Sequence, residues 1–302
     1  MIRLALFLLF TLLDAGVIAA TAPPETGDLH RSYLLPEANE TIEYRLYIPK
    51  TYDGTHAYPL IVVLHGSSTT ASDVMQVPGL REQAERRKVI LLAPQGYNAF
   101  GGYGDIYPVV VTREAAAQAD ALLLASRPGA NAAHGMTRPS ADAQPAAAED
   151  YAELKINGLT DPRVSRLSEL DTLNVLTRVR SEYRIDPARI YLIGNSMGAG
   201  GVAYLAARYP QLWAAIAPSS GPFAAWSYPY FQLREQHIAA LFIHGDQDEY
   251  SHWKWSQEIV ARARREGVDA RLLVVPGGSH VQAWRTVLPQ TFDFLLAHRR
   301  SP

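Results

Sequence analysis

Residues 189–198 read Arg-Ile-Tyr-Leu-Ile-Gly-Asn-Ser-Met-Gly, and they are the most informative part of the chain. The first five are mostly apolar, which is typical of a buried strand, and Gly194 to Gly198 form the pattern G-x-S-x-G. After a strand and before a helix, this pattern describes a tight turn that presents a nucleophilic serine, here Ser196. Because the pattern by itself also occurs in ordinary glycine-rich turns, its meaning depends on the residues downstream of it in the chain.

Candidate partners for Ser196 come later in the chain in a definite order. An apolar run at 240–243 leads into His-Gly-Asp-Gln-Asp and ends at Asp248. A second run at 270–275 leads into Pro-Gly-Gly-Ser-His and ends at His280. Serine, acid and histidine in this order, each just after a strand, are expected of an α/β-hydrolase.

These three side chains supply the parts of one reaction. A serine hydroxyl is a weak nucleophile at neutral pH, so His280 would take its proton during attack and return a proton to the leaving group. Asp248 would hold the imidazole in the required tautomer and stabilise its cationic form. Asp246, in the same loop, is the alternative acid. Taken singly, each of these residues would also suit an ordinary loop.

The loop after another strand is expected to supply the oxyanion hole. Residues 60–64 are a near-continuous apolar run, as in a parallel strand buried on both faces, and they lead into His65, Gly66 and Ser67. In this fold one oxyanion donor is a backbone N–H of that loop, and the other belongs to the residue after the nucleophile. We therefore predict Ser67 and Met197 as the donors. We expect His65 to hold the loop by hydrogen bonds rather than to transfer protons.

Further patterns complete the predicted fold. A helical pattern covers 168–183, and we expect Asp186 and Pro187 to end it. Other strands are expected at 43–48, 89–93 and 213–217. Strands that alternate with helices imply a mostly parallel central sheet flanked by helices. The predicted fold class is therefore α/β, with the α/β-hydrolase architecture.

The composition agrees with a single catalytic domain, which we place at 23–302. The chain has 302 residues, of which 48% are hydrophobic, enough for one large core. Its net charge of −2 gives no basic surface, so we expect no nucleic-acid partner. It has no cysteine, and its nine histidines show no H-E-x-x-H spacing, so we expect neither a metal nor another cofactor. The oligomeric state is not indicated by the composition.

The N-terminal segment has the pattern of a signal peptide. Arg3 precedes the apolar stretch 4–13, and small residues between 19 and 22 would suit a signal peptidase. The alternative is a membrane anchor, but Asp14 interrupts the apolar stretch and leaves it too short to span a bilayer. We therefore expect residues 1–22 to be removed from a secreted or periplasmic protein without stable membrane insertion.

Two segments on the predicted active-site face carry aromatic residues. The segment 97–161 leaves the carboxyl end of a strand, so we expect an insertion over this face, and we predict that Tyr103 and Tyr107 line the substrate site. Its Ala- and Pro-rich part, 127–148, suits a flexible connection, although a lid is the alternative. Trp226, after a later strand, is a third candidate for the substrate wall. Such a loop would equally suit a role in covering the core.

The region around the motif resembles a known group of enzymes. Residues 183–187 (Tyr-Arg-Ile-Asp-Pro), 189–198 and 206–210 (Ala-Ala-Arg-Tyr-Pro) are similar to secreted α/β-hydrolases of the polyhydroxybutyrate depolymerase and feruloyl or acetyl-xylan esterase type. They are also similar to the catalytic domain of prolyl-oligopeptidase-type serine peptidases. The resemblance extends over about 43–280, apart from the insertion.

The resemblance implies a catalytic triad of Ser196, Asp248 and His280, with the spacing H-G-x-x-D favouring Asp248 over Asp246. The family's D-x-x-V-P reads Asp-Glu-Tyr-Ser-His at 248–252, a departure that concerns local substrate contacts rather than the triad. The implied function is a secreted serine carboxylic-ester hydrolase that forms an acyl-enzyme with a small-molecule or polymeric ester. The alternatives are a peptidase with the same triad and, less favoured by the complete triad, a non-catalytic binding protein. The fold does not determine the acyl or alcohol group.

Overall fold

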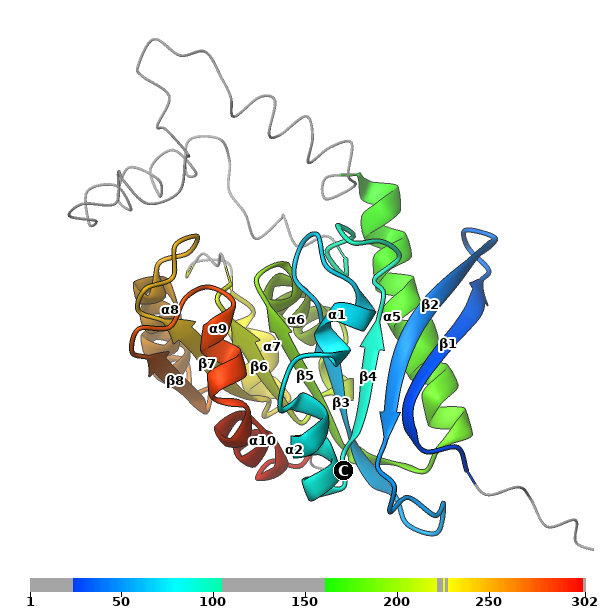
Figure 1. Cartoon of the computed structure of the whole chain (residues 1–302). Coiled ribbons are helices and arrows are strands. Elements are labelled where there is room, and N and C mark those ends of the chain that lie inside the picture. Colours follow the sequence, from blue (N-terminus) through cyan, green and yellow to red (C-terminus); the bar gives the residue numbers. More distant parts are fainter. Residues whose placement is uncertain (1–23, 105–160, 222–224, 226–227, 301–302) are drawn as a thin grey trace, which may run out of the picture.

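The computed structural model describes residues 24–104, 161–221, 225 and 228–300. Within these residues the centre of the molecule is one eight-stranded sheet in the order β1-β2-β4-β3-β5-β6-β7-β8 (Figure 1). The strands are β1 (Gly27–Leu35), β2 (Glu40–Ile48), β3 (Tyr58–Leu64), β4 (Ile90–Pro94), β5 (Ile185–Asn195), β6 (Ala215–Ser219), β7 (Ala239–Gly245) and β8 (Ala270–Val275). The helices are α1 (Ala71–Met75), α2 (Leu80–Arg87), α5 (Pro162–Glu182), α6 (Met197–Arg208), η2 (Pro210–Leu212), α7 (Tyr230–Glu235), α8 (Trp253–Arg265), α9 (Gln282–Thr286) and α10 (Leu288–Leu296).

The sheet is mostly parallel, as predicted. Strand β1 pairs antiparallel with β2, and β2 pairs antiparallel with β4. The other neighbouring strands pair in parallel. Parallel strands in succession require a crossover after each strand, and the helices provide these crossovers.

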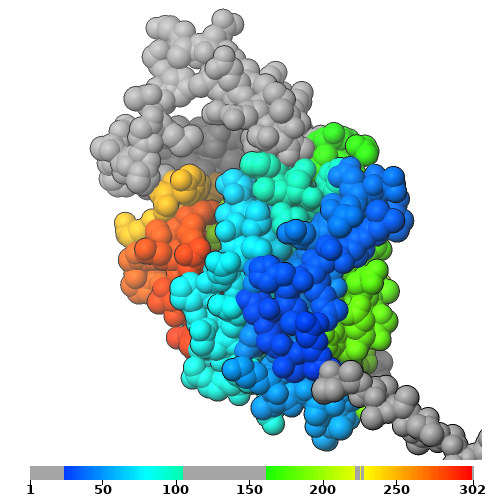
Figure 2. Space-filling model, turned by 45° about the vertical axis from the view of Figure 1, so that its right-hand side comes forward, coloured from blue at the N-terminus to red at the C-terminus, as the bar shows by residue number. Residues whose placement is uncertain are grey.

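The parallel strands are apolar because helices cover both faces of the sheet. All residues of β3 and of β7 are buried, which explains their continuous apolar sequences. At the edge, β1 buries only three of its nine residues, and sequence patterns alone did not predict it. Figure 2 shows β1 and β2, in blue, at the surface beside α5, in green.

Two core layers lie on the two faces of the sheet. Helices α5, α6, α7 and α8 cover one face, with Val202 of α6 and Ile259 of α8 among the buried side chains. Helices α1, α2, α9 and α10 cover the other, with Leu80 of α2 and Phe292 of α10. This three-layer arrangement confirms the predicted α/β fold class.

Helix α5 differs from its prediction at both ends. The pattern predicts 168–183, whereas the helix begins at Pro162 because the side chain of Asp161 caps it and proline suits the first helical position. Asp186 and Pro187, which we expected to end the helix, belong to β5 instead. Proline is tolerated at the beginning of a strand, where its missing N–H costs little.

The carboxyl ends of the parallel strands lie along one edge of the sheet, the upper edge in Figure 1. The loops after β3, β5, β7 and β8 therefore emerge on the same side of the molecule, and each carries a residue predicted for catalysis. The predicted signal peptide and most of the predicted insertion lie outside the described residues. None of the helices that the structure describes is long and apolar enough to cross a membrane.

Candidate active site

The predicted nucleophile lies on a strained turn between β5 and α6. Ser196 has φ of 58° and ψ of −118°, a conformation that costs free energy in a residue with a side chain. A Cβ on Gly198 would lie 2.4 Å from the carbonyl oxygen of Leu64, and one on Gly194 would lie 2.4 Å from that of Gly198. The two glycines are therefore required for the close approach of strand, turn and helix.

The predicted base and acid are in contact. Nδ1 of His280 lies 2.9 Å from Oδ2 and 3.0 Å from Oδ1 of Asp248. Both residues are buried, with 7% and 6% of their surfaces exposed. The carboxylate of Glu249 accepts a hydrogen bond from the backbone N–H of His280 over 3.1 Å, which further fixes the loop after β8.

Asp248 is held as a carboxylate by its hydrogen bonds. Burial alone would raise its pKa, but hydrogen bonds from His244, His280 and the backbone of Ser251 outweigh burial and hold the pKa well below its ordinary value. The backbone N–H groups of Tyr250 and Ser251 donate to Oδ1 over 2.9 and 2.8 Å. Asp248 can therefore stabilise a positive charge on His280.

The alternative acid has a different partner. Oδ1 of Asp246 accepts a hydrogen bond from the backbone N–H of Gly277 over 2.7 Å. That contact joins the loops after β7 and β8 but does not involve His280. The geometry thus pairs His280 with Asp248 and assigns Asp246 a role within the loops.

His65 holds the loop that carries Ser67. Its two ring nitrogens lie 2.8 Å from the carbonyl oxygens of Gly66 and Gln95, and it is buried. Burial lowers the pKa of His65, and the two carbonyl contacts partly oppose that effect. This arrangement agrees with the predicted loop-holding role.

The two predicted oxyanion donors are the backbone N–H groups of Ser67 and Met197. Among the described residues, no hydrogen bond uses the backbone N–H of Ser67. Met197 is the first residue of α6, where backbone N–H groups have no acceptor within the helix. The positive end of the helix dipole also lies at this point. Both positions are therefore suited to a developing negative charge.

Ser196 and His280 line one cavity of about 130 Å³, which Ser67 also lines. Its apolar lining residues are Leu64, Val74, Val77, Val281 and Trp284. No hydrogen bond joins Ser196 to His280 in the part of the chain that the structure describes, although contacts of this kind often tighten only when substrate binds. The cavity thus brings the nucleophile, the base and one oxyanion donor to a common space.

The prediction for Tyr103 as a substrate contact is wrong in this structure. Its ring is fully buried, its backbone N–H donates to Ser168, and its hydroxyl accepts a hydrogen bond from the backbone N–H of His65 over 2.8 Å. A side chain enclosed in this way holds the backbone of the oxyanion loop. It exposes no surface that a substrate could contact. Tyr107 and Trp226 lie outside the described residues.

Tyr250 is an aromatic residue at the site that the sequence analysis did not select. Its side chain is 66% exposed, and its ring lies edge-on to that of His280 with 4.9 Å between centroids. His244, also not selected, is fully buried and contacts Asp248. The departure from D-x-x-V-P at 248–252 was the available signal for Tyr250, and the first position of the H-G-x-x-D spacing was the available signal for His244.

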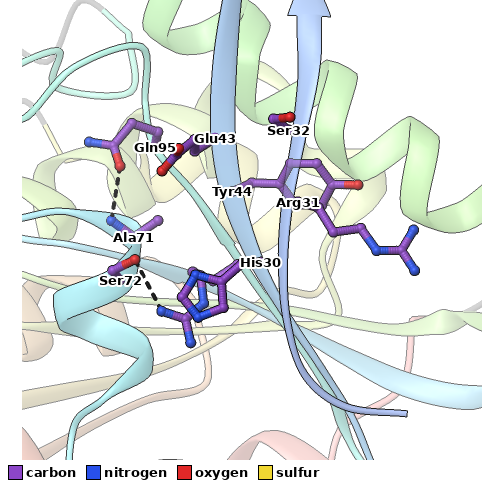
Figure 3. A pocket seen from close by; sticks show the side chains of 9 residues that line it. His30, Arg31, Ser32, Glu43, Tyr44, Ala71, Ser72 and Gln95 are labelled. Atoms are coloured by element: carbon purple, nitrogen blue, oxygen red, sulfur yellow. Dashed lines mark hydrogen bonds between the residues drawn. The ribbon is translucent and has the colours of Figure 1, made fainter. Parts of the chain in front are cut away.

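A second cavity, of about 140 Å³, lies between β1, β2 and α1 (Figure 3). In Figure 3 the side chain of Gln95 reaches the backbone of Ala71. The buried guanidinium of Arg45 binds Ser72 and Asp28 beside it. This cavity contains none of the predicted catalytic residues, and its polar groups join β2 to α1.

Comparisons with known proteins agree with the geometry. Residues 169–227, which include the nucleophile turn, match the family Esterase PHB depolymerase. No curated protein matches the chain in sequence. Solved structures resemble it over most of its length, although their sequence identities are low.

Three of these structures illustrate the likeness. A thermostable esterase is 20% identical, with 90% of this chain and 63% of that chain covered and a TM-score of 0.59. A ferulic acid esterase is 15% identical, with 90% and 98% covered and a TM-score of 0.60. A fluorophosphonate-binding serine hydrolase of Staphylococcus aureus is 16% identical, with 90% and 99% covered and a TM-score of 0.58.

This chain spans less than two thirds of the thermostable esterase. Identities this low establish the fold and leave the substrate open. With the sheet order, the turn at Ser196 and the family match, the chain has the α/β-hydrolase fold and resembles serine esterases of the polyhydroxybutyrate depolymerase and feruloyl esterase type.

Proposed function

We propose that the chain is a serine carboxylic-ester hydrolase that acts through an acyl-enzyme. The observation that carries this proposal is the strained Ser196, which shares a cavity with a histidine paired to a buried carboxylate. Ser196 is the nucleophile, His280 the general base and acid, and Asp248 the residue that orients His280. The backbone N–H groups of Ser67 and Met197 are the oxyanion donors.

The reaction has two stages. Nε2 of His280 takes the hydroxyl proton as Oγ of Ser196 bonds to the ester carbonyl carbon, and the carbonyl oxygen becomes an oxyanion at the two N–H groups. As the ester C–O bond breaks, His280 gives the proton to the departing alcohol, which leaves an acyl-serine. Water then repeats the sequence, with its proton passing to His280, and releases the carboxylic acid and free Ser196.

The size and lining of the cavity favour a small acyl group. A volume of about 130 Å³ is well below the roughly 300–1,000 Å³ of sites that enclose a drug-sized ligand. Val74, Val77 and Trp284 provide apolar contact, so a short apolar acyl chain would lose water there. The exposed ring of Tyr250 beside His280 is suited to contact the leaving alcohol.

The test is hydrolysis of a substrate panel by the wild type and by Ser196→Ala. We expect turnover of p-nitrophenyl acetate, and we expect Ser196→Ala to reduce it by a factor on the order of 10⁶ without changing the unfolding temperature. A fluorophosphonate should label Ser196, as located by mass spectrometry of the peptides. Labelling of another serine would contradict the assignment, and faster cleavage of an aminoacyl p-nitroanilide than of any ester would indicate a peptidase.

Export is part of the proposed function. It is supported by Arg3, the apolar stretch 4–13 and the small residues between 19 and 22. Expression of the full chain in a bacterium, followed by N-terminal sequencing of periplasmic material, should give a mature protein that begins near residue 21 or 23. An intact N-terminus on protein confined to the cytoplasm would contradict export.

A further inference from the structure

Asp248 is in contact with two histidines. Its Oδ2 lies 2.9 Å from Nδ1 of His280 and 3.1 Å from Nε2 of His244. His244 belongs to β7, four residues before the acid, and its side chain is fully buried. The proposed ester hydrolysis uses only His280, so the buried contact with His244 requires an explanation of its own.

The contacts of His244 identify which ring nitrogen carries hydrogen. Nε2 faces Oδ2 of Asp248 and, at 3.0 Å, the backbone carbonyl oxygen of Ser251, both of which can only accept a hydrogen bond while Asp248 is ionised. Its third neighbour, Oγ of Ser251 at 3.1 Å, can accept as well. Nε2 must therefore carry the proton. Nδ1 lies 2.8 Å from Oγ of Ser256 on α8, which is 2% exposed, so this hydroxyl can donate to the nitrogen. Ser256 thereby satisfies the nitrogen opposite the one that donates to Asp248 and helps to orient the ring.

Ser251 also contacts the carboxylate of Asp248. Its Oγ lies 3.0 Å from Oδ2 of Asp248 and 3.2 Å from the carbonyl oxygen of Ser220, and its backbone N–H donates to Oδ1. Among the described residues, the partners of Asp248 thus include groups of its own loop, His280 and a side chain from the sheet, His244. Because His244 belongs to β7, it ties the acid loop to a rigid element.

We propose that His244, oriented by Ser256, is a positioning residue for Asp248. Its N–H fixes Oδ2 so that the carboxylate faces His280, and it withdraws part of the negative charge that His280 would otherwise meet. Asp248 then lies between two serine–histidine pairs, one exposed to the cavity and one buried in the core. The pair Ser196 and His280 lines the cavity, whereas His244 and Ser256 are enclosed in the core and cannot reach a substrate.

Other charged groups lie close enough to affect the pH dependence of His280. Glu249 accepts from its backbone N–H, and the ring of Tyr250 packs against its imidazole. Asp73 of α1 and Arg285 of α9 line the same cavity. Variants at His244 leave these groups unchanged. A difference in pH dependence between the variants is therefore caused by the change at His244.

The kinetic test compares His244→Met with His244→Gln. Methionine fills space without a donor, whereas the amide of glutamine can place an N–H near the position of Nε2. We expect the methionine variant to lower kcat for p-nitrophenyl acetate by about tenfold to a hundredfold, the range known for groups that orient metal-binding side chains, with little change in KM. The glutamine variant should recover most of this loss.

The pH profile separates positioning from a structural role. Without the His244 donor, more negative charge faces His280, which then holds its proton more strongly, so the acid limb of kcat/KM should move to higher pH in the methionine variant. Ser256→Ala, which removes the hydrogen bond that orients the ring but keeps the N–H of His244, should give a smaller change in the same direction. Equal losses in the methionine and glutamine variants, with unchanged acid limbs, would overturn the proposal.

A second measurement does not depend on turnover. The catalytic role of His244 rests on the proposed function. The tautomer of His244 does not, and it can be measured by nitrogen NMR of Ser196→Ala protein labelled at histidine nitrogen. We expect His244 to carry hydrogen on Nε2, and to keep it there when Ser256→Ala is added, because the acceptors at Nε2 remain. Hydrogen on Nδ1 alone would overturn the proposal even in an active enzyme. If the expected tautomer is found but the wild type has no esterase activity, the result would instead contradict the proposed function.

Discussion

Two aspartates of the loop after β7 bind different partners, which makes their roles separable by substitution. Asp248 contacts the imidazole of His280, whereas Asp246 accepts from the backbone of Gly277. Asp248→Asn should lower kcat by on the order of a thousandfold or more, because an amide no longer favours the tautomer and the cation of His280. Steady-state kinetics with p-nitrophenyl acetate measure the loss.

Asp246→Asn serves as the matched control. The amide oxygen of asparagine can still accept from Gly277, so we expect a stability loss of at most about 1 kcal/mol and a kcat close to that of the wild type. Urea unfolding of both variants separates the effects on stability from those on catalysis. The opposite ranking of the two kcat values would identify Asp246 as the acid.

Single residues also differ in how far their sequence context predicts their roles. Ser196 and its flanking glycines could be predicted because a strained turn needs specific residue types in neighbouring positions. His244 could not, because its role depends on contacts with Ser256 and Asp248 that only the packing of α8 against β7 creates. The H-G-x-x-D spacing marks the position of His244 in the chain but does not show its contacts.

At the scale of elements, the end of β7 lies against the loop that carries His280. A Cβ on Gly245 would lie 1.9 Å from the carbonyl oxygen of Gly278. Because the atom it would meet belongs to the backbone and cannot rotate away, Gly245→Ala must push the two loops apart and so separate Asp248 from His280. We expect at least about a tenfold loss of kcat, since displacements of about 1 Å at a catalytic group have large effects.

Gly267→Ala provides the control for replacing a glycine. Gly267 has φ of 87°, but the nearest atom to its added Cβ is 3.6 Å away on the side chain of Arg234. The variant should lose about 1–2 kcal/mol of stability through backbone strain and keep its kcat. If Gly245→Ala and Gly267→Ala have the same effect on kcat, the contact between the two loops is unimportant for catalysis.

Tyr103 connects the start of the insertion to the oxyanion loop. Its hydroxyl accepts from the backbone N–H of His65, and its ring lies edge-on to that imidazole with 5.4 Å between centroids. Tyr103→Phe leaves a buried N–H without its acceptor, at a cost of about 1–3 kcal/mol. We expect kcat to fall by a similar factor for p-nitrophenyl acetate and for a bulky aryl ester, because the donor at Ser67 is affected rather than a substrate wall.

The control for Tyr103→Phe is Tyr97→Phe in the same loop. The hydroxyl of Tyr97 reaches Glu40 at the exposed surface over 3.1 Å, so its removal should leave both activities unchanged. A rise in KM for the aryl ester alone, in Tyr103→Phe, would restore Tyr103 as a substrate contact. Circular dichroism and thermal unfolding would confirm that both variants fold.

Elements differ in how well their sequences predicted them. Strands β3 and β7 were predictable because burial on both faces leaves continuous apolar runs. Strand β1 was not predictable, because it forms a strand through its pairing with β2 and has no clear strand pattern of its own. The burial of Tyr103 had the same origin, since the ring packs between Gly96 and Gly201, residues far from each other in the chain.

At the scale of the whole molecule, one carboxylate joins three distant segments. Asp171 of α5 accepts from the hydroxyl of Tyr33 in β1 over 2.7 Å and from the backbone N–H of Gly96, after β4, over 2.7 Å. The backbone N–H of Tyr97 donates to the same carboxylate over 3.3 Å. The edge of the sheet, the longest described helix and the loop that leads to Tyr103 thus meet at one buried charge.

Burial at this site sets the pH dependence of stability. It raises the pKa of Asp171 from 3.8 to about 6, even though the hydrogen bonds from Tyr33, Tyr97 and Gly96 oppose the rise. Between these two pH values the folded protein keeps a proton that the unfolded chain releases. Asp171 therefore supports stability at low pH, and this support is lost as pH rises toward 6, by about 3 kcal/mol in all.

Asp171→Asn tests this linkage against the rest of the molecule. The amide can accept from the N–H groups of Gly96 and Tyr97 and donate to the hydroxyl oxygen of Tyr33, but it does not ionise. From pH 4 to pH 7, the free energy of unfolding of the wild type should therefore fall by about 2 kcal/mol relative to the variant, as measured by urea unfolding at each pH. Asp248, whose low pKa acts in the opposite direction, is present in both proteins and cancels in the difference. A difference that is constant with pH, or that grows in favour of the wild type as pH rises, would show that Asp171 is ionised without cost in the folded protein.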